Sequence, residues 1–222
     1  MELLQVAVLG GLLALDGTSV GQFMLSRPLV AGGLVGWALG EPALGFTVGA
    51  ILELYLLVSF PTGGSRFPEG ATATVVAVGA AAGTTVPGAI PLAIAVGLLW
   101  GQLGGFSISV LRHLNARLVP EPGRAAKVGK GGKGVTTAHL LAVFADFMRG
   151  TVMTFFGVLL GRAVVRGFGA AWPLDEASST GLLLLGGAVS AGILVRDLGG
   201  FRRRGALLVT GMALGILGAR LL

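Results

Sequence analysis

The sequence contains no cysteine among its 222 residues, and only two histidines, His113 and His139. A disulfide framework, a zinc site built on thiolates and a cysteine nucleophile are therefore excluded. A covalent phosphoryl relay needs a positioned His or Cys, but we expect His113 to be solvated and His139 to pack against or cap a helix. No GxxxxGK[ST] phosphate cradle is present. We expect no catalytic residue, metal site, cofactor or ATP-driven pump in this chain.

Charge is scarce as well, since 12% of the residues are charged, against roughly a quarter in an ordinary soluble domain. Hydrophobic residues make up 54% of the chain and the mean hydropathy is +0.87. A crossing needs about 20 apolar residues, so the length allows roughly six to eight full or partial spans. We expect an all-α polytopic membrane protein with broken helices and re-entrant segments, residues 1–222 forming a single membrane transport domain.

Apolar segments alternate with proline breaks, because proline lacks an N–H and disfavours helix in the residue before it. The N-terminal segment follows the acidic Glu2 rather than a basic stretch, so we expect a retained span. The Gly/Ala-rich pieces 28–40 and 71–86 suit re-entrant arms or closely packed helices. The expected segments are 3–20, 28–40, 42–60, 71–86, 88–111, 137–166, 180–196 and 205–222, with breaks at Pro28, Pro42, Pro61, Pro68, Pro87 and Pro91.

The basic residues gather in two hydrophilic stretches. Residues 112–134 carry six Arg or Lys against a single acid, Glu121, and a second cluster contains Arg196 and the three arginines at 202–204. The positive-inside rule places both in the cytoplasm, with two crossings between them and the loop 172–179 outside. Binding to lipid headgroups is a compatible interpretation of the second cluster. The sequence pI near 11.1 therefore indicates topology rather than a nucleic-acid partner.

From Glu2 to Phe60 only four further charged residues interrupt the hydrophobic sequence: Asp16, Arg27, Glu41 and Glu53. An ionisable side chain in hydrocarbon is costly and normally faces a bundle interior or a water-filled cavity, where it commonly serves a substrate path. Glycine and proline recur in the same run, and broken backbone at membrane depth is tolerated only where protein or a cavity covers it. The run therefore predicts a polar pathway of a transporter.

Short motifs in this part of the chain also carry a family resemblance. Their order and spacing resemble the membrane component IIC of the mannose/fructose/sorbose family of phosphotransferase-system permeases. In that family an aromatic-containing motif ending in Arg-Pro-Leu-Val/Ile precedes Leu-Gly-Asp/Glu, Leu-Glu-Leu/Met and Pro-Asp/Glu before an Ala-rich helix. The corresponding residues here are Phe23, Arg27, Pro28, Leu29, Leu39, Gly40, Glu41, Leu52, Glu53, Leu54, Pro68 and Glu69.

A weaker second block agrees with this resemblance. His139 and Arg149 match a His-to-Arg helix of the family, and the segment 195–211 resembles its final inter-helix segment. Asp146 and Arg149 are three residues apart on this expected helix, which is close enough for them to pair with each other.

The resemblance implies a sugar pathway shared with a sister membrane subunit, IID, in the bacterial inner membrane. Cytoplasmic IIA and IIB subunits would pass phosphate to the arriving sugar, so this chain would be the non-phosphorylated permease subunit. We expect it to lie in the lipid bilayer as a multi-pass protein and as part of an oligomer. The insert 123–134 has no obvious family counterpart and is a candidate docking loop for a soluble partner.

Carboxylates bind sugar hydroxyls well, because a charged acceptor roughly doubles the strength of a hydrogen bond. Glu53 lies inside an apolar run, where an unpaired carboxylate is penalised, and is the leading ligand candidate. An ion pair of Glu53 with Arg27 or Arg66 is the alternative. Glu69 follows Pro68 in a glycine-containing loop, and is interpreted either as a ligand or as an exposed loop acid.

Asp16 and Gln22 belong to the phrase DGTSVGQ, which is too polar for lipid contact and suits the wall of the same cavity. For Asp16 an N-cap or Asx-turn role is equally open. Arg27 is first a structural cation that ties the broken segment to Glu41 or Glu53, and second a ligand. The predicted substrate-binding residues are Glu53, Glu69, Gln22, Asp16 and Arg27.

The chain departs from the family pattern at a few positions. Well-known members carry an acid pair and a Gln where this chain has Gly21, Gln22 and Met24, and an Asn near Pro61. These departures leave three alternatives to a simple hexose open: an amino sugar, another hexose derivative, or a system whose transport role has diverged.

Two other functions are alternatives to a sugar permease subunit. An ion-coupled secondary transporter would use Asp16, Glu53 and Glu69 for protons or cations. A purely structural scaffold predicts that Glu53→Gln and Glu69→Gln leave uptake unchanged. For a transporter we expect alternating access, with the site at the breaks 16–27 and 53–69 in one module and a second module anchored to lipid and neighbouring subunits.

Overall fold

The structure is a computed structural model that describes residues 2–59, 66–117, 131–197, 205–207 and 209–213. Within these ranges no residue is in a strand, so the all-α prediction is confirmed. Predictions for Pro61, for the centre of the basic stretch 112–134, for Arg202–Arg204 and for much of 205–222 concern residues outside the described part. The helices are α1 (Glu2–Thr18), α2 (Pro28–Ala38), α3 (Pro42–Tyr55), α4 (Gly70–Ala81), α5 (Ala89–Ala116), α7 (Gly131–Phe168), the 3-10 turn η1 (Gly169–Ala171) and α8 (Glu176–Asp197).

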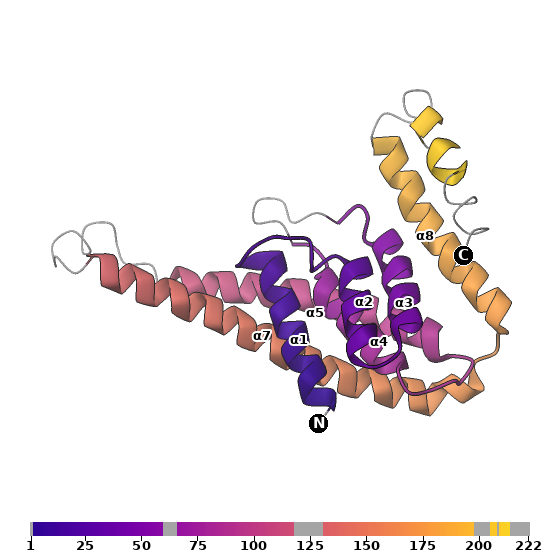
Figure 1. The fold of residues 1–222 in the computed structure, drawn as a ribbon, viewed down its shortest axis with the longest axis horizontal. Helices are drawn as coiled ribbons and strands as arrows, with labels where there is room; N and C mark the ends of the chain where they lie inside the picture. The colour runs from indigo at the N-terminus through magenta and orange to yellow at the C-terminus, as the bar shows by residue number, and fades with distance from the viewer. Residues whose placement is uncertain (1, 60–65, 118–130, 198–204, 208, 214–222) are drawn as a thin grey trace.

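Three of these helices are too short to cross a bilayer. The 11, 14 and 12 residues of α2, α3 and α4 correspond to about 17, 21 and 18 Å, against about 30 Å of hydrocarbon. Pro28 and Pro42 occupy the first helical positions of α2 and α3, where the missing N–H costs nothing. The helices α2 and α3 lie side by side as a hairpin (Figure 1). The predicted broken segments are therefore present.

The longer helices α5, α7 and α8 are long and apolar enough to span a membrane. Their 28, 38 and 22 residues correspond to about 42, 57 and 33 Å. The helices α5 and α7 run beside each other and extend beyond the bundle toward the basic stretch (Figure 1). Both are longer there than predicted: α5 continues to Ala116 instead of residue 111, and α7 begins at Gly131 instead of 137. Residues 112–116 contain neither glycine nor proline, so nothing local stops α5.

The centre of the bundle is α4. Every residue from Ala71 to Ala81 is buried, and the helices α1, α2, α3, α5 and α7 all contact it. Its side chains are almost all small, so neighbouring backbones approach closely. At the C-terminal end of α4, the Nε of Arg162 donates to the carbonyl of Gly79 at 2.9 Å, which satisfies a free helix carbonyl. Because Glu69 and the residues from Ala71 onward are buried, the N-terminal end of α4 lies deep inside the protein.

The helix α8 lies at the edge of the bundle (Figure 1). It contacts α3, where the Ser190 hydroxyl donates to the Tyr55 carbonyl at 3.1 Å, and its outer face exposes large apolar side chains such as Leu185. Its start is capped by Asp175, whose carboxylate accepts the Ser178 N–H at 2.7 Å. Hydrogen bonds from the Ser178 hydroxyl and N–H hold the pKa of Asp175 below its ordinary value.

Candidate functional site

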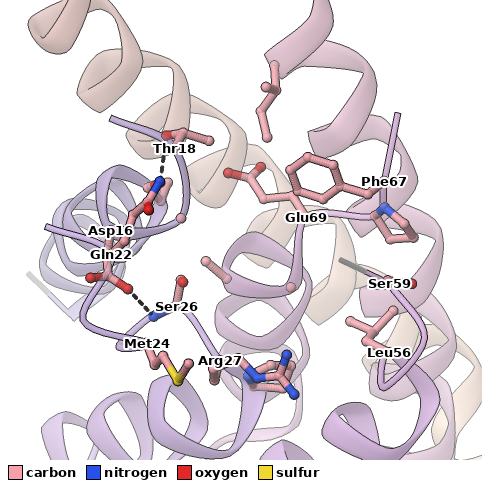
Figure 2. A pocket seen from close by; sticks show the side chains of 17 residues that line it. Asp16, Thr18, Gln22, Met24, Ser26, Arg27, Leu56, Ser59, Phe67 and Glu69 are labelled. Atoms are coloured by element: carbon pink, nitrogen blue, oxygen red, sulfur yellow. Dashed lines mark hydrogen bonds between the residues drawn. The ribbon is translucent and has the colours of Figure 1, made fainter. Parts of the chain in front are cut away.

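A cavity of about 330 Å³ lies where α1 ends, α2 begins and α4 begins. Figure 2 shows Asp16, Thr18 and Gln22 on one side of this pocket and Leu56, Ser59 and Phe67 on the other, with Glu69 between the two sides. Of the five predicted site residues, four line it and the fifth, Glu53, does not. The lining residues are Ala14, Asp16, Gly17, Thr18, Gln22, Met24, Ser26, Arg27, Pro28, Leu56, Ser59, Phe67, Pro68, Glu69, Gly70, Ala71 and Ile108.

Asp16 lies in the last turn of α1 and holds the loop that follows. Its carboxylate accepts the Phe23 N–H at 2.7 Å and the Ser26 N–H at 2.9 Å, and the residue is buried. The loop needs this support, because Gln22 and Met24 have φ values of 56° and 65°, which side-chain-bearing residues rarely adopt. Asp16 thus lines the cavity and stabilises the loop through two hydrogen bonds. It is not the N-cap of α2, which is Arg27.

Arg27 and Glu53 form an ion pair at the start of α2. The second carboxylate oxygen of Glu53 also accepts the Leu29 N–H at 3.3 Å. Both oxygens of Glu53 therefore bind residues at the N-terminal end of α2. The other proposed partner, Arg66, lies over the ring of Phe106 at 5.8 Å. Glu53 was interpreted as a ligand or as the partner of an arginine, and the structure contains the ion pair with Arg27. Arg27 itself lines the pocket.

Glu41 does not pair with Arg27. Its carboxylate accepts the Gly83 N–H at 2.8 Å, and Glu41 directly precedes α3. Glu41 is therefore a boundary residue at the start of α3. This carboxylate lies outside the pocket lining.

Glu69 is 4% exposed, so the interpretation as an exposed loop acid is wrong. Its backbone N–H donates to the Gly101 carbonyl at 2.8 Å, which places the residue against α5. The Arg149 guanidinium of α7 binds both carboxylate oxygens, with Nη1 at 2.9 Å from Oε2 and Nη2 at 2.7 Å from Oε1. The Thr72 hydroxyl donates to Oε2 at 2.9 Å. A bidentate Arg–carboxylate pair is strong and geometrically specific.

Asp146 completes this network. The Nε of Arg149 donates to Asp146 Oδ1 at 2.9 Å, so the predicted pair on one helix is confirmed. The other oxygen of Asp146 accepts the hydroxyls of Thr18 and Ser19 at the end of α1. Arg149 also donates to the Ser107 hydroxyl at 2.9 Å. Side chains from α1, α5, α7 and the start of α4 thus meet behind the pocket.

Sequence reasoning missed the contact of Arg149 with Glu69, and with it Thr72 and Ser107. A usable signal was present, because a guanidinium has five donors and Asp146 alone does not satisfy them. An arginine in the middle of a long apolar helix therefore required further acceptors. Nothing in the local sequence indicated which of the remote acids supplied them.

Both histidines lie away from the pocket lining. His113 and His139 are exposed, and the Nδ1 of His113 is 2.7 Å from the Ser109 carbonyl oxygen one turn earlier in α5. The exposure of His113 agrees with its expected solvation. The expected packing or capping role of His139 is wrong, because His139 is exposed and lies inside α7 rather than at one of its ends.

A bundle of long apolar helices, with half-helices that end at a polar pocket, defines a membrane transport protein. The family described as PTS system sorbose-specific IIC component matches residues 1–193, and the chain belongs to this family. It is therefore the membrane component IIC of a sugar phosphotransferase system, the permease subunit, whereas phosphorylation is carried out by the IIB component.

Two solved structures share the fold. One is described as the structure of a membrane protein, with a TM-score of 0.71 and 19% identity, and the match covers 99% of this chain and 92% of that chain. The other is the cryo-EM structure of the mannose transporter ManYZ in complex with microcin E492, with a TM-score of 0.61, 20% identity and the same two coverages. No curated protein matches the sequence.

Proposed function

We propose that the pocket at the helix breaks is the sugar site of this IIC subunit, and that the chain moves a hexose-type sugar across the bacterial inner membrane for phosphorylation by IIB. The observation that carries the proposal is the buried Glu69 carboxylate, which lines a cavity of about 330 Å³ beside Asp16, Gln22 and Arg27. This volume lies at the lower end of the roughly 300–1,000 Å³ of ligand pockets. A single sugar ring suits such a space.

The lining residues have complementary hydrogen-bonding chemistry. A carboxylate offers about four acceptor positions, and Arg149 and Thr72 use three of those of Glu69. Glu69 keeps capacity for a sugar hydroxyl, and Asp16 accepts two N–H groups and also keeps capacity. Gln22 and Arg27 supply donors, and Glu53 orients Arg27 through their ion pair. The proposed role of Glu53 is therefore positioning rather than direct binding.

The proposal includes the partners that the family membership suggests. A sister membrane subunit IID shares the sugar pathway, cytoplasmic IIA and IIB subunits supply phosphate, and the complex is an oligomer. The chain acts as one multi-pass transport unit that works by alternating access, and the basic insert 123–134 docks a soluble partner. Large apolar side chains exposed on α5, α7 and α8 support burial in lipid and against neighbouring subunits.

The decisive experiment measures uptake of labelled sugars in cells that contain this chain with and without its IID and IIB partners. We expect uptake only with the partners present. Glu69→Gln should reduce uptake at least tenfold, because loss of a charged hydrogen-bond acceptor costs about 1.5–3 kcal/mol. The matched control is Glu41→Gln, which changes a carboxylate outside the pocket and should leave uptake intact. Uptake by the chain alone, driven by an ion gradient, would overturn the proposal in favour of a secondary transporter.

A further inference from the structure

The Asp146–Arg149 pair of α7 lies outside the pocket lining and binds residues on two different sides of the pocket. Arg149 holds Glu69 at the start of α4, and Asp146 holds the hydroxyls of Thr18 and Ser19 at the end of α1. Thr18 and Glu69 both line the pocket, whereas Asp146 and Arg149 do not. One charged pair on one helix therefore connects two pocket-lining segments that are remote in the sequence.

This network is buried and specific in its geometry. The exposed fractions of the side chains are 5% for Glu69, 9% for Arg149 and 2% for Asp146. Arg149 has no freedom to turn, since its Nε is bound to Asp146 and both Nη atoms are bound to Glu69. A planar guanidinium can bind both oxygens of one carboxylate through its two Nη atoms while its Nε binds a second carboxylate. A lysine ammonium cannot do this.

We propose that Asp146 and Arg149 are positioning residues for sugar binding. They fix the plane of the Glu69 carboxylate and set its separation from the end of α1. The free acceptor positions of Glu69 then face the sugar hydroxyls at one defined angle. This inference rests on the proposed sugar site, because Arg149 acts only through Glu69.

The test measures sugar affinity and maximal uptake rate of the full chain together with its partner subunits. Arg149→Lys keeps the charge but loses the fork, so the half-saturating sugar concentration should rise about tenfold or more. The amount of folded protein in the membrane should change little. Ser107→Ala removes one acceptor of Arg149 and is expected to shift the affinity in the same direction by a few-fold, which keeps the test decisive if Arg149→Lys fails to fold. Arg162→Lys is the matched control, because Arg162 is on the same helix and binds a backbone carbonyl at the other end of α4.

A double-mutant cycle separates positioning from a purely structural role. Sugar binding to the purified complex is titrated for Arg149→Lys, Glu69→Gln and the double variant. If Arg149 acts through Glu69, Arg149→Lys should add less than about twofold once Glu69 is Gln. An equal loss in both backgrounds, or unchanged affinity in Arg149→Lys and Ser107→Ala, overturns the inference while the sugar site stands. Unchanged affinity in Glu69→Gln instead overturns the sugar site itself.

Discussion

Single side chains hold the broken backbone of this protein together. Asp16 binds two N–H groups of the loop after α1, Glu41 binds the Gly83 N–H, and Arg162 binds the Gly79 carbonyl. Inside a bilayer no water is available for such groups, and each unsatisfied one costs several kcal/mol. Charged side chains at helix ends therefore replace the missing intrahelical partners. For Glu41 and Arg162 this use of charge is structural only, whereas Asp16 also lines the pocket.

The loop after α1 gives a prediction at the residue scale. Met24 has a φ of 65°, and this left-handed conformation costs a side-chain-bearing residue about 1–2 kcal/mol. Its side chain is 70% exposed, so little packing is lost when it is removed. Met24→Gly should therefore be more stable than Met24→Ala by about 1 kcal/mol, measured as the midpoint of thermal unfolding in detergent. Equal midpoints for the two variants would show that the conformation is not strained.

At the scale of elements, the hairpin of α2 and α3 depends on backbone contact. A Cβ atom at Gly45 of α3 would overlap the carbonyl oxygen of Gly32 and lie 2.7 Å from the Cα of Gly36 on α2. Gly49 faces the Pro28 carbonyl in the same way. Small residues that let helix backbones touch are typical of membrane interfaces. The hairpin sets where α2 begins and so where Arg27 meets the pocket.

Gly45→Ala tests this element directly. The added methyl meets backbone atoms that cannot rotate away, so the hairpin must separate at a cost of about 1–3 kcal/mol or more. The control is Gly181→Ala on α8, where nothing lies within 4 Å of the added Cβ and where alanine favours the helix. Thermal unfolding midpoints of the two variants give the comparison. A midpoint for Gly45→Ala at or above that of the parent chain would contradict close contact of the two helices.

The topology of the whole molecule depends on which ends of the long helices lie on the same side of the membrane. At about 57 Å, α7 exceeds the roughly 30 Å of hydrocarbon, so it is tilted or extends beyond the bilayer. The first part of α7 and the last part of α5 extend from the same side of the bundle (Figure 1), and the basic stretch 112–134 includes the end of α5 and the start of α7. This arrangement suits a cytoplasmic position for residues 112–134 and an outer position for the loop before α8.

The absence of cysteine makes this topology easy to test, because any introduced thiol is unique. Ser178→Cys, in the first turn of α8, should react with a membrane-impermeant maleimide in intact cells. Arg117→Cys, at the end of α5, should react only after the cells are permeabilised. Both positions are exposed, so a difference in labelling reports the side of the membrane. Labelling of Arg117→Cys in intact cells would reverse the proposed orientation.

Much of the architecture was predictable from the sequence, because its causes are local. Hydropathy marks apolar helices, and Pro28 and Pro42 begin helices where they were expected. The Asp146–Arg149 contact followed from a spacing of three residues on one helix. The predicted apolar segments 88–111 and 137–166 are shorter than the helices α5 and α7, because both helices continue into more polar residues beyond the apolar run.

The sequence by itself determined that this is a membrane transport protein with broken helices, and its motifs indicated the family. Only the tertiary structure decided which charges meet. Glu53 lies outside the pocket lining and pairs with Arg27, which belongs to it. The buried Glu69 lines the pocket and binds Arg149. The physical reason is that hydropathy and proline act on neighbouring residues, whereas ion pairs between remote helices depend on how the whole bundle packs.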